Sequence, residues 1–117
     1  MGVKVDHLEK VETRRLDSIF NECVSGIPNP RVYLKMDTQG FDLKVFEGCE
    51  YILDNILALQ SEISIRHLYE ETPDFKDSIS TMEKQGFDIS GVFPVSRDGK
   101  LRIIEIDCVM VHSFIEE

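Results

Sequence analysis

The chain has 117 residues, of which 42% are hydrophobic and 30% charged, as in an ordinary globular domain. Acids outnumber bases 22 to 13, and the resulting net charge of −9 repels phosphate backbones, which disfavours nucleic acid as a partner. No apolar run approaches the roughly 20 residues that span a bilayer, and the first ten residues hold no apolar signal-peptide core. We therefore expect one soluble domain over residues 1–117, flexible over 1–12, without a membrane as partner.

Cysteine usage indicates the compartment. The three cysteines are far apart, and none belongs to a Cys-x-x-Cys pair: Cys23, Cys49 and Cys108. This spacing argues against a disulfide framework and against a zinc site. We expect three buried thiols in a reducing compartment, the cytoplasm.

The first half of the chain predicts a short helix, a strand and a broken helix. Asp17 stands in N-cap position for a helix over 18–24, which the Gly- and Pro-containing residues 25–30 end. A buried strand is expected over 32–36. Apolar residues then recur at helical spacing from 41 to 56, and Gly48 is expected to split this stretch into two helices.

The second half predicts a strand over 59–65 and then a helix that starts at Thr72 and Pro73, with Thr72 as its N-cap. Its buried stripe consists of Phe75, Ile79 and Met82, and Gly86 closes it.

Two strands end the chain, over 87–95 and 101–111, joined by a hairpin turn that contains the favoured Asp98-Gly99 pair. The last strand alternates apolar residues at 104, 106, 108 and 110. Helical crossovers imply parallel pairing and right-handed connections, whereas a hairpin forces antiparallel pairing. We expect an α/β fold: a mostly parallel sheet with one antiparallel strand from the C-terminal β-hairpin, and helices on its faces.

Four segments, taken in order, resemble one known family. Residues 34–42, Leu-Lys-Met-Asp-Thr-Gln-Gly-Phe-Asp, resemble its Lys-hydrophobic-Asp-x-x-Gly-x-Glu motif, with Asp42 where Glu is more usual. Residues 13–17 resemble its Leu-Asp segment, 45–49 its Val-Leu-x-Gly-Ala segment, and 105–111 its closing strand. The chain thus resembles the carboxyl-terminal half of an FkbM-type S-adenosylmethionine-dependent methyltransferase, from about residue 11 to 112.

The resemblance implies strands 4 to 7 of a Rossmann-like sheet in the order 3-2-1-4-5-7-6. It also implies methyl transfer from S-adenosylmethionine to an oxygen of a small molecule or sugar. Strand 1, with the Gly-rich loop that holds the cofactor's methionine part, and strand 2, whose terminal acid binds the ribose, have no counterpart in this sequence. Because positioning supplies much of such catalysis, we expect the isolated chain to be inactive or nearly so.

Candidate site residues follow the first strand, since the ligand crevice of open α/β sheets lies beyond the carboxyl ends of the strands. The resemblance implies that Asp37 faces cofactor and acceptor, where it orients an acceptor hydroxyl or accepts its proton. Thr38 and Gln39 supply hydrogen-bonding groups to the cofactor on the same turn. A compatible alternative is that Asp37 caps the helix at Phe41.

Three further candidates would bind the substrate: Glu62, His67 and Tyr69. His67 and Tyr69 follow the second strand on the same rim as Asp37, and a histidine, which titrates near neutral pH, can serve as general base. Glu62 is better explained by an ion pair with Lys35 on the neighbouring strand. A metal site of Asp37, Glu62 and His67 lacks diagnostic spacing, so no metal is expected.

Asp107, inside the last strand, is expected to pair with Arg102 or another base rather than to act in catalysis.

The main alternative is a non-catalytic binding or interaction module that kept the sheet and lost the chemistry. In the parent fold, strand 1 covers the edge of the strand that here spans 32–36. We expect this edge to be covered by self-pairing, by residues 3–14 or by a partner chain, because unpaired strand edges associate readily. The partners expected are therefore a small-molecule or sugar acceptor, and either a second copy or a missing N-terminal half.

Overall fold

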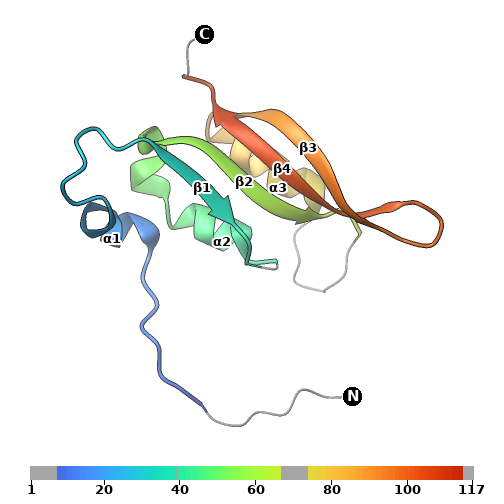
Figure 1. Ribbon diagram of the computed structural model, residues 1–117, viewed down its shortest axis with the longest axis horizontal. Coiled ribbons are helices and arrows are strands. Elements are labelled where there is room, and N and C mark those ends of the chain that lie inside the picture. Colours follow the sequence, from blue (N-terminus) through green and yellow to red (C-terminus); the bar gives the residue numbers. More distant parts are fainter. Residues whose placement is uncertain (1–7, 39, 67–73, 115–117) are drawn as a thin grey trace.

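The computed structural model describes residues 8–38, 40–66 and 74–114. Within these ranges, Figure 1 shows helices and strands that alternate along the chain. Their order is α1 (Leu16–Cys23), β1 (Val32–Met36), α2 (Asp42–Glu47), the 3-10 helix η1 (Glu50–Asn55), β2 (Ile56–Ser64), α3 (Phe75–Lys84), β3 (Phe87–Arg97) and β4 (Ile103–His112). None of the helices in the described ranges is long and apolar enough to cross a membrane.

The strands form one sheet in the order β1-β2-β4-β3 (Figure 1), which is the 4-5-7-6 order that the resemblance implies. β1 and β2 are parallel, whereas β4 runs antiparallel to both β2 and β3. The expectation of a mostly parallel sheet is not confirmed, since β1–β2 is the one parallel pair among the described strands. The returning strand of the hairpin lies between β2 and β3, and a single reversed strand there creates two antiparallel ladders.

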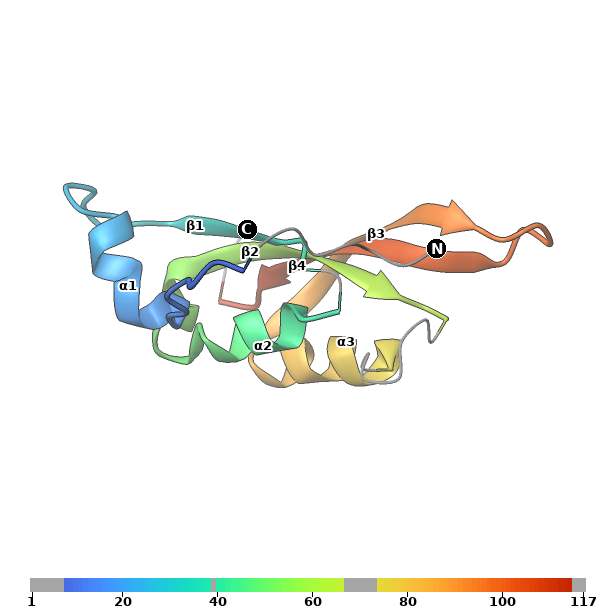
Figure 2. The same cartoon turned by 90° about the horizontal axis from the view of Figure 1, so that it is seen from below.

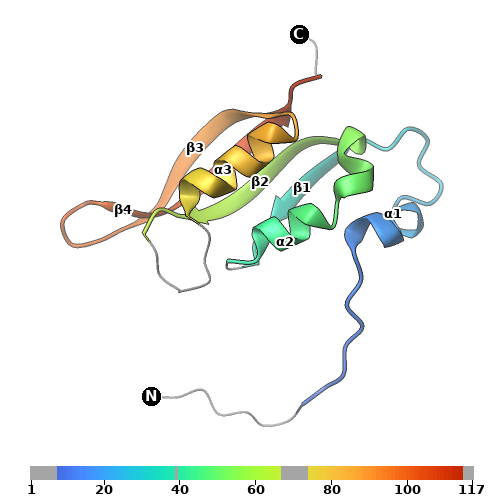
Figure 3. The ribbon, with the colours of Figure 1, turned by 180° about the vertical axis from the view of Figure 1, so that it is seen from behind.

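The described helices lie on one face of the sheet (Figure 2), and Figure 3 shows α2 and α3 crossing that face. The sequence predicted helices on the faces of the sheet. Both crossovers step across the sheet in the same direction, from β1 to β2 and from β2 toward β3. Right-handed connections in one direction place their helices on one side, so the other face carries none of the described helices.

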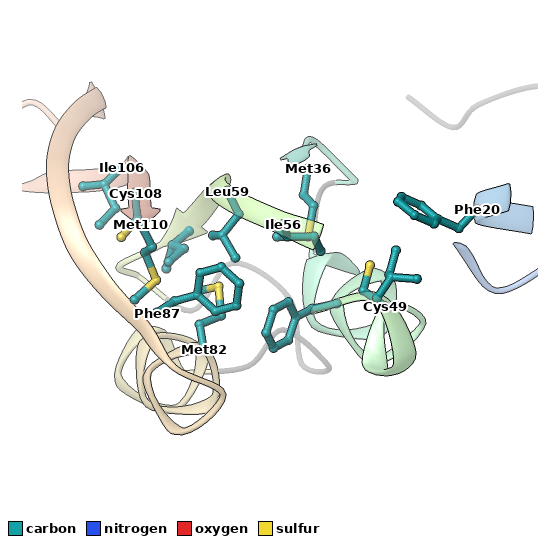
Figure 4. Packing of buried hydrophobic residues seen from close by; sticks show 13 residues of the cluster. Phe20, Met36, Cys49, Ile56, Leu59, Met82, Phe87, Ile106, Cys108 and Met110 are labelled. Carbon is teal, nitrogen blue, oxygen red and sulfur yellow. The ribbon is translucent and has the colours of Figure 1, made fainter. Parts of the chain in front are cut away.

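The core lies between the sheet and these helices. Buried residues of β2 and β4 point toward the helices, where Met82 of α3 lies (Figure 4), and Phe46 of α2 belongs to the same buried cluster. The buried apolar residues of β2 and β4 are Ile56, Leu59, Ile63, Ile106, Cys108 and Met110. The predicted alternation of the last strand is thus confirmed at 106, 108 and 110. The predicted stripe of α3 is also confirmed, with Phe75 and Ile79 packed against the core beside Met82.

The cysteine prediction holds for two of the three residues. Cys49 and Cys108 are fully buried, and burial raises the pKa of the Cys49 thiol to about 11, so it stays protonated at neutral pH. Cys23 is exposed because it is the last residue of α1, where the helix gives way to the surface connection toward β1.

Two helix starts differ from the sequence prediction. The first helix begins at Leu16 with Arg15 in the N-cap position, so Asp17 lies within the first turn, where it binds the Arg15 guanidinium at 2.9 Å. At α3 the cap is Asp74, whose carboxylate accepts from the Lys76 backbone N–H at 2.8 Å. The predicted cap at Thr72 and Pro73 lies outside the described residues.

The break at Gly48 is confirmed, since α2 ends at Glu47 and a 3-10 helix follows. The second strand, however, begins at Ile56, three residues before the predicted start. Ile56 pairs with Val32 of β1, and that pairing extends the strand backward. Short apolar runs fit a buried strand and a buried helix equally well, so local spacing does not separate the two.

The hairpin connection between β3 and β4 contains Asp98 and Gly99 as predicted, but it spans residues 98–102 rather than 96–100. The Asp98 N–H donates to the Arg102 carbonyl at 2.9 Å, and the Asp98 carboxylate accepts from the N–H groups of Lys100 and Arg102. Leu101 takes a left-handed conformation with φ of 65°. The Asp98 side chain therefore organises the five-residue loop that joins the two strands.

Candidate functional site

The candidate site is the turn that leaves the carboxyl end of β1. Asp37 and Thr38 directly follow Met36 and are exposed. Gly40 has φ of 100°, a left-handed conformation that glycine adopts without strain, and it turns the chain into α2. Asp37 therefore lies at the carboxyl end of β1, where the predicted ligand crevice begins. Gln39, the third predicted residue of this turn, lies outside the described residues.

Asp42, the first residue of α2, lies beneath this turn and is only 8% exposed. Its Oδ1 accepts from the backbone N–H of Thr38 at 3.0 Å and from the Thr38 hydroxyl. Its Oδ2 accepts from the Ser61 hydroxyl of β2 at 2.6 Å, and Ser61 is 2% exposed. The Asp42 carboxylate thus connects the turn after β1 to the neighbouring strand.

The alternative role of Asp37 as a helix cap is wrong. The N-cap position of α2 is Phe41, which makes no side-chain cap hydrogen bond. The carboxylate that closes the turn instead belongs to Asp42, because it lies four residues after Thr38 and folds back onto the Thr38 N–H. Asp37 accepts no hydrogen bond from the described residues, and its side chain faces solvent.

The predicted ion pair between Glu62 and Lys35 is also wrong. The register between β1 and β2 sets Lys35 opposite Gln60, and the register between β2 and β4 sets Glu62 opposite Asp107. Glu62 instead shares a hydrogen bond with Glu105. That bond, followed by partial burial and by the charges of Glu105, Asp37 and Asp107, raises the pKa of Glu62 to about 7.

Asp107 does not pair with Arg102 as predicted. The Arg102 guanidinium donates to the Asp98 carboxylate at 2.8 Å, within the loop between β3 and β4. Three acids therefore act on Glu62: Glu105, Asp37 and Asp107.

The remaining predicted site residues cannot be placed, because His67 and Tyr69 lie outside the described residues. The metal site considered for Asp37, Glu62 and His67 falls partly outside them as well. Within the described ranges, no group of three or more His, Cys, Asp or Glu side chains is arranged to hold a metal ion.

A small cavity lies beside the Asp42 network. It measures about 30 Å³ and is lined by Gly40, Asp42, Leu43, Ser61, Glu62, Ile63, Ser64, Ser78 and Met82. A cavity of this size is comparable to the volume of one water molecule, whereas sites that enclose a nucleoside-sized ligand take several hundred Å³. The described residues at this corner can therefore contact a cofactor from one side, but they do not enclose one.

An open α/β sheet in this order, with an acid exposed at the carboxyl end of β1, is consistent with a methyltransferase-like fold. The methyltransferase FkbM domain model matches residues 2–89, which are 88 of the 117 residues. The chain belongs to the FkbM methyltransferase family. No curated protein and no solved structure matches it.

Sequence reasoning missed Asp42 and Ser61 as parts of the site. Asp42 was noted only as a departure from the family's usual Glu. Ser61 alternates with Leu59 and Ile63 on the buried side of β2, and a hydroxyl at such a position requires a partner. That single polar residue in an apolar row was the signal that an acid lay nearby.

Proposed function

We propose that this protein takes part in methyl transfer from S-adenosylmethionine to an oxygen of a small molecule or sugar. The observation that carries the proposal is Asp37. It is exposed at the carboxyl end of β1, inside the region that matches the methyltransferase FkbM domain. Open α/β folds bind their ligands at this edge.

In this proposal the cofactor supplies an electrophilic methyl group, and the chain's own residues act on the acceptor. The Asp37 carboxylate accepts a hydrogen bond from the acceptor hydroxyl and thereby orients the oxygen for attack. The methyl carbon would exchange its bond to the cofactor's sulfur, which keeps the electron pair, for a bond to the acceptor oxygen, and Asp37 would take the hydroxyl proton. Thr38 is exposed on the same turn, and its carbonyl contributes a polar contact there, while its hydroxyl donates to Asp42.

The isolated 117-residue chain is proposed to hold the cofactor weakly and to be inactive or nearly so. The cavity beside Asp42 is about 30 Å³, so the described residues at this corner surround too little of such a ligand. Catalysis of methyl transfer depends on holding donor and acceptor in line, and a cofactor held from one side is poorly oriented.

The test is a titration of the ¹⁵N-labelled chain with S-adenosylmethionine, followed by NMR and calorimetry. We expect amide shifts centred on Asp37, Thr38 and Gly40, with an affinity weaker than micromolar. Asp37→Asn should reduce the response to an added acceptor alcohol, while Asp88→Asn, an exposed acid on β3, should not. Micromolar affinity would contradict the one-sided site, and no response of the turn at millimolar cofactor would contradict the role of Asp37.

A second candidate function is an interaction module that associates through β1. Among the described residues β1 pairs with β2 alone, so its other edge is unpaired. Residues 8–14, which were expected as one possible cover, are exposed and form no strand. An unpaired edge is a template for pairing with another chain.

Light scattering and amide exchange test this second function. We expect a dimer or larger species, with slow exchange at Tyr33 and Lys35 because their strand is covered on both sides. A monodisperse monomer with fast exchange at these two residues would rule out association through β1.

A further inference from the structure

Side-chain contacts between β2 and the segment after β1 continue beyond the last backbone pair of the ladder between β1 and β2. The last pair in the ladder between them is Met36 opposite Ser61, and the chain leaves the sheet immediately after Met36. Ser61 then makes a further contact, because its hydroxyl donates to Asp42 at 2.6 Å. The side chain at the final rung of the ladder therefore holds the segment that follows β1.

Asp42 accepts hydrogen bonds both from Ser61 and from the turn that follows β1. Its second oxygen accepts from the Thr38 N–H at 3.0 Å and from the Thr38 hydroxyl. With donors on both oxygens, this nearly buried carboxylate is satisfied, as burial of a charged group requires. The donors come from a strand and from a turn, so the carboxylate fixes the position of one relative to the other.

Asp37 is the residue between the end of the strand and the anchored Thr38. Its backbone is held by Met36 on one side and by the Asp42 contact on the other. No hydrogen bond from the described residues fixes its own side chain. The direction in which Asp37 points is therefore set by the conformation of the turn.

We propose that Asp42 and Ser61 are positioning residues that hold Thr38 in place so that the neighbouring Asp37 meets the acceptor in one orientation. This inference rests on the proposed function for the role of Asp37. The anchoring itself rests on the contacts of Asp42 and can be measured without activity.

The test compares amide hydrogen exchange in the wild-type chain and in Asp42→Ala, Asp42→Asn and Ser61→Ala. Asp42→Ala removes the acceptor of the Thr38 N–H, so Thr38 should exchange about tenfold faster. Asn keeps one acceptor oxygen and a polar group for Ser61, so Asp42→Asn should recover part of the protection. Ser61→Ala, which loses one hydroxyl and is expected to fold, should speed Thr38 exchange by a smaller factor.

Two matched controls separate positioning from general loss of stability. Asp74→Asn changes a carboxylate that also accepts from a backbone N–H, at the start of α3, and Ser90→Ala removes an exposed hydroxyl from β3. Neither should alter Thr38 exchange. In the Asp42 variants, exchange at Thr38 should rise more than exchange in the ladder between β2 and β4, which reports global unfolding.

The same samples are titrated with S-adenosylmethionine. Unchanged Thr38 exchange in both Asp42→Ala and Ser61→Ala, or a rise no larger than that of the strand amides, overturns the anchoring, whatever the cofactor does. If Thr38 exchange rises in the variants as expected, but the amides of the wild-type turn do not shift when S-adenosylmethionine is added, the anchoring stands and the proposed function fails. If the turn responds equally in wild type and Asp42→Ala, the positioning role fails while the proposed function stands.

Discussion

At the scale of single residues, Glu62 and Asp107 face each other across β2 and β4, with Glu105 close by. Like charges placed directly opposite in an antiparallel pair repel each other. A proton shared between Glu62 and Glu105 relieves this repulsion. That hydrogen bond, partial burial and the surrounding charges raise the pKa of Glu62 from 4.5 to about 7.

The raised pKa of Glu62 makes stability depend on pH. Between pH 4.5 and about 7 the folded chain keeps a proton that the unfolded chain has lost. The stability from this proton is therefore fully present below pH 4.5 and is lost as the pH rises through about 7. Burial lowers the pKa of His112, so the stability that the neutral form of His112 contributes is lost as the pH falls. The effect of His112 on stability is therefore opposite in sign to that of Glu62.

Glu62→Gln isolates the contribution of Glu62. Because glutamine does not ionise, the variant should lose less stability than wild type as the pH rises through about 7, and should be the more stable protein above it. Urea unfolding followed by circular dichroism across this range gives the comparison. Glu47→Gln, an exposed acid on α2, is the control. Identical pH profiles for Glu62→Gln and wild type would contradict the raised pKa.

The two predictions about acids of the site differ in what they depend on. The position of Asp37 follows from local signals, a buried strand and then a turn that contains Gly40, and the structure places it at the strand end as predicted. The partner of Glu62 depends on register between strands, which no local pattern reveals. Lys35 lies opposite Gln60 rather than Glu62, so the expected ion pair does not form.

At the scale of elements, Gly86 ends α3 and starts the path into β3. Its φ of 96° is a left-handed conformation, and its carbonyl accepts from the Ser113 N–H at 2.7 Å. A Cβ built at Gly86 would meet His112 and Ser113 at 3.5 Å, an ordinary contact. The cost of a side chain here is therefore conformational and not steric.

Gly86→Ala should lower the free energy of unfolding by roughly 1–2 kcal/mol, the cost of the left-handed conformation for an L-residue. Gly99→Ala is the matched control, because a Cβ at Gly99 meets nothing within 4 Å. We expect Gly99→Ala to change stability by less than about 0.5 kcal/mol in urea unfolding. A loss at Gly86 no larger than that at Gly99 would refute the conformational argument.

The elements themselves were predicted unevenly. The bounds of β1 agree with the expected 32–36, and the break at Gly48 and the end of α3 at Gly86 are confirmed. These features rest on glycine chemistry and on short-range apolar spacing. The start of β2 was wrong, because pairing with β1 extends the strand backward. The loop after β3 contains Asp98 and Gly99 as predicted, but it lies two residues further along the chain than expected, because β3 runs on to Arg97 and β4 starts at Ile103.

At the scale of the whole molecule, Phe87 joins the layers. It is fully buried at the start of β3, with its ring 5.9 Å from Phe46 of α2 and 4.8 Å from His112 of β4. Both contacts have edge-to-face geometry, which aromatic rings prefer. One side chain thus packs against a helix and the neighbouring strand.

Phe87→Ala should lower the free energy of unfolding by about 3–5 kcal/mol, because the cavity adds to the lost apolar burial. That is a large part of the 5–15 kcal/mol that typically holds a small domain together. Phe93→Ala, on the same strand but with the ring 57% exposed, should cost far less. Thermal and urea unfolding give the free energy of unfolding of the two variants. Similar decreases in the two would show that Phe87 is not central to the core.

Local sequence patterns predicted the order of helices and strands, the apolar rows of the core and the position of Asp37 at a strand end. Each follows from residues close together in the chain. Only the tertiary structure decided that the described helices share one face, that Glu62 meets Glu105 and Asp107, and that Ser61 reaches Asp42. These contacts join segments far apart in the chain, and their register is set by packing across the whole sheet.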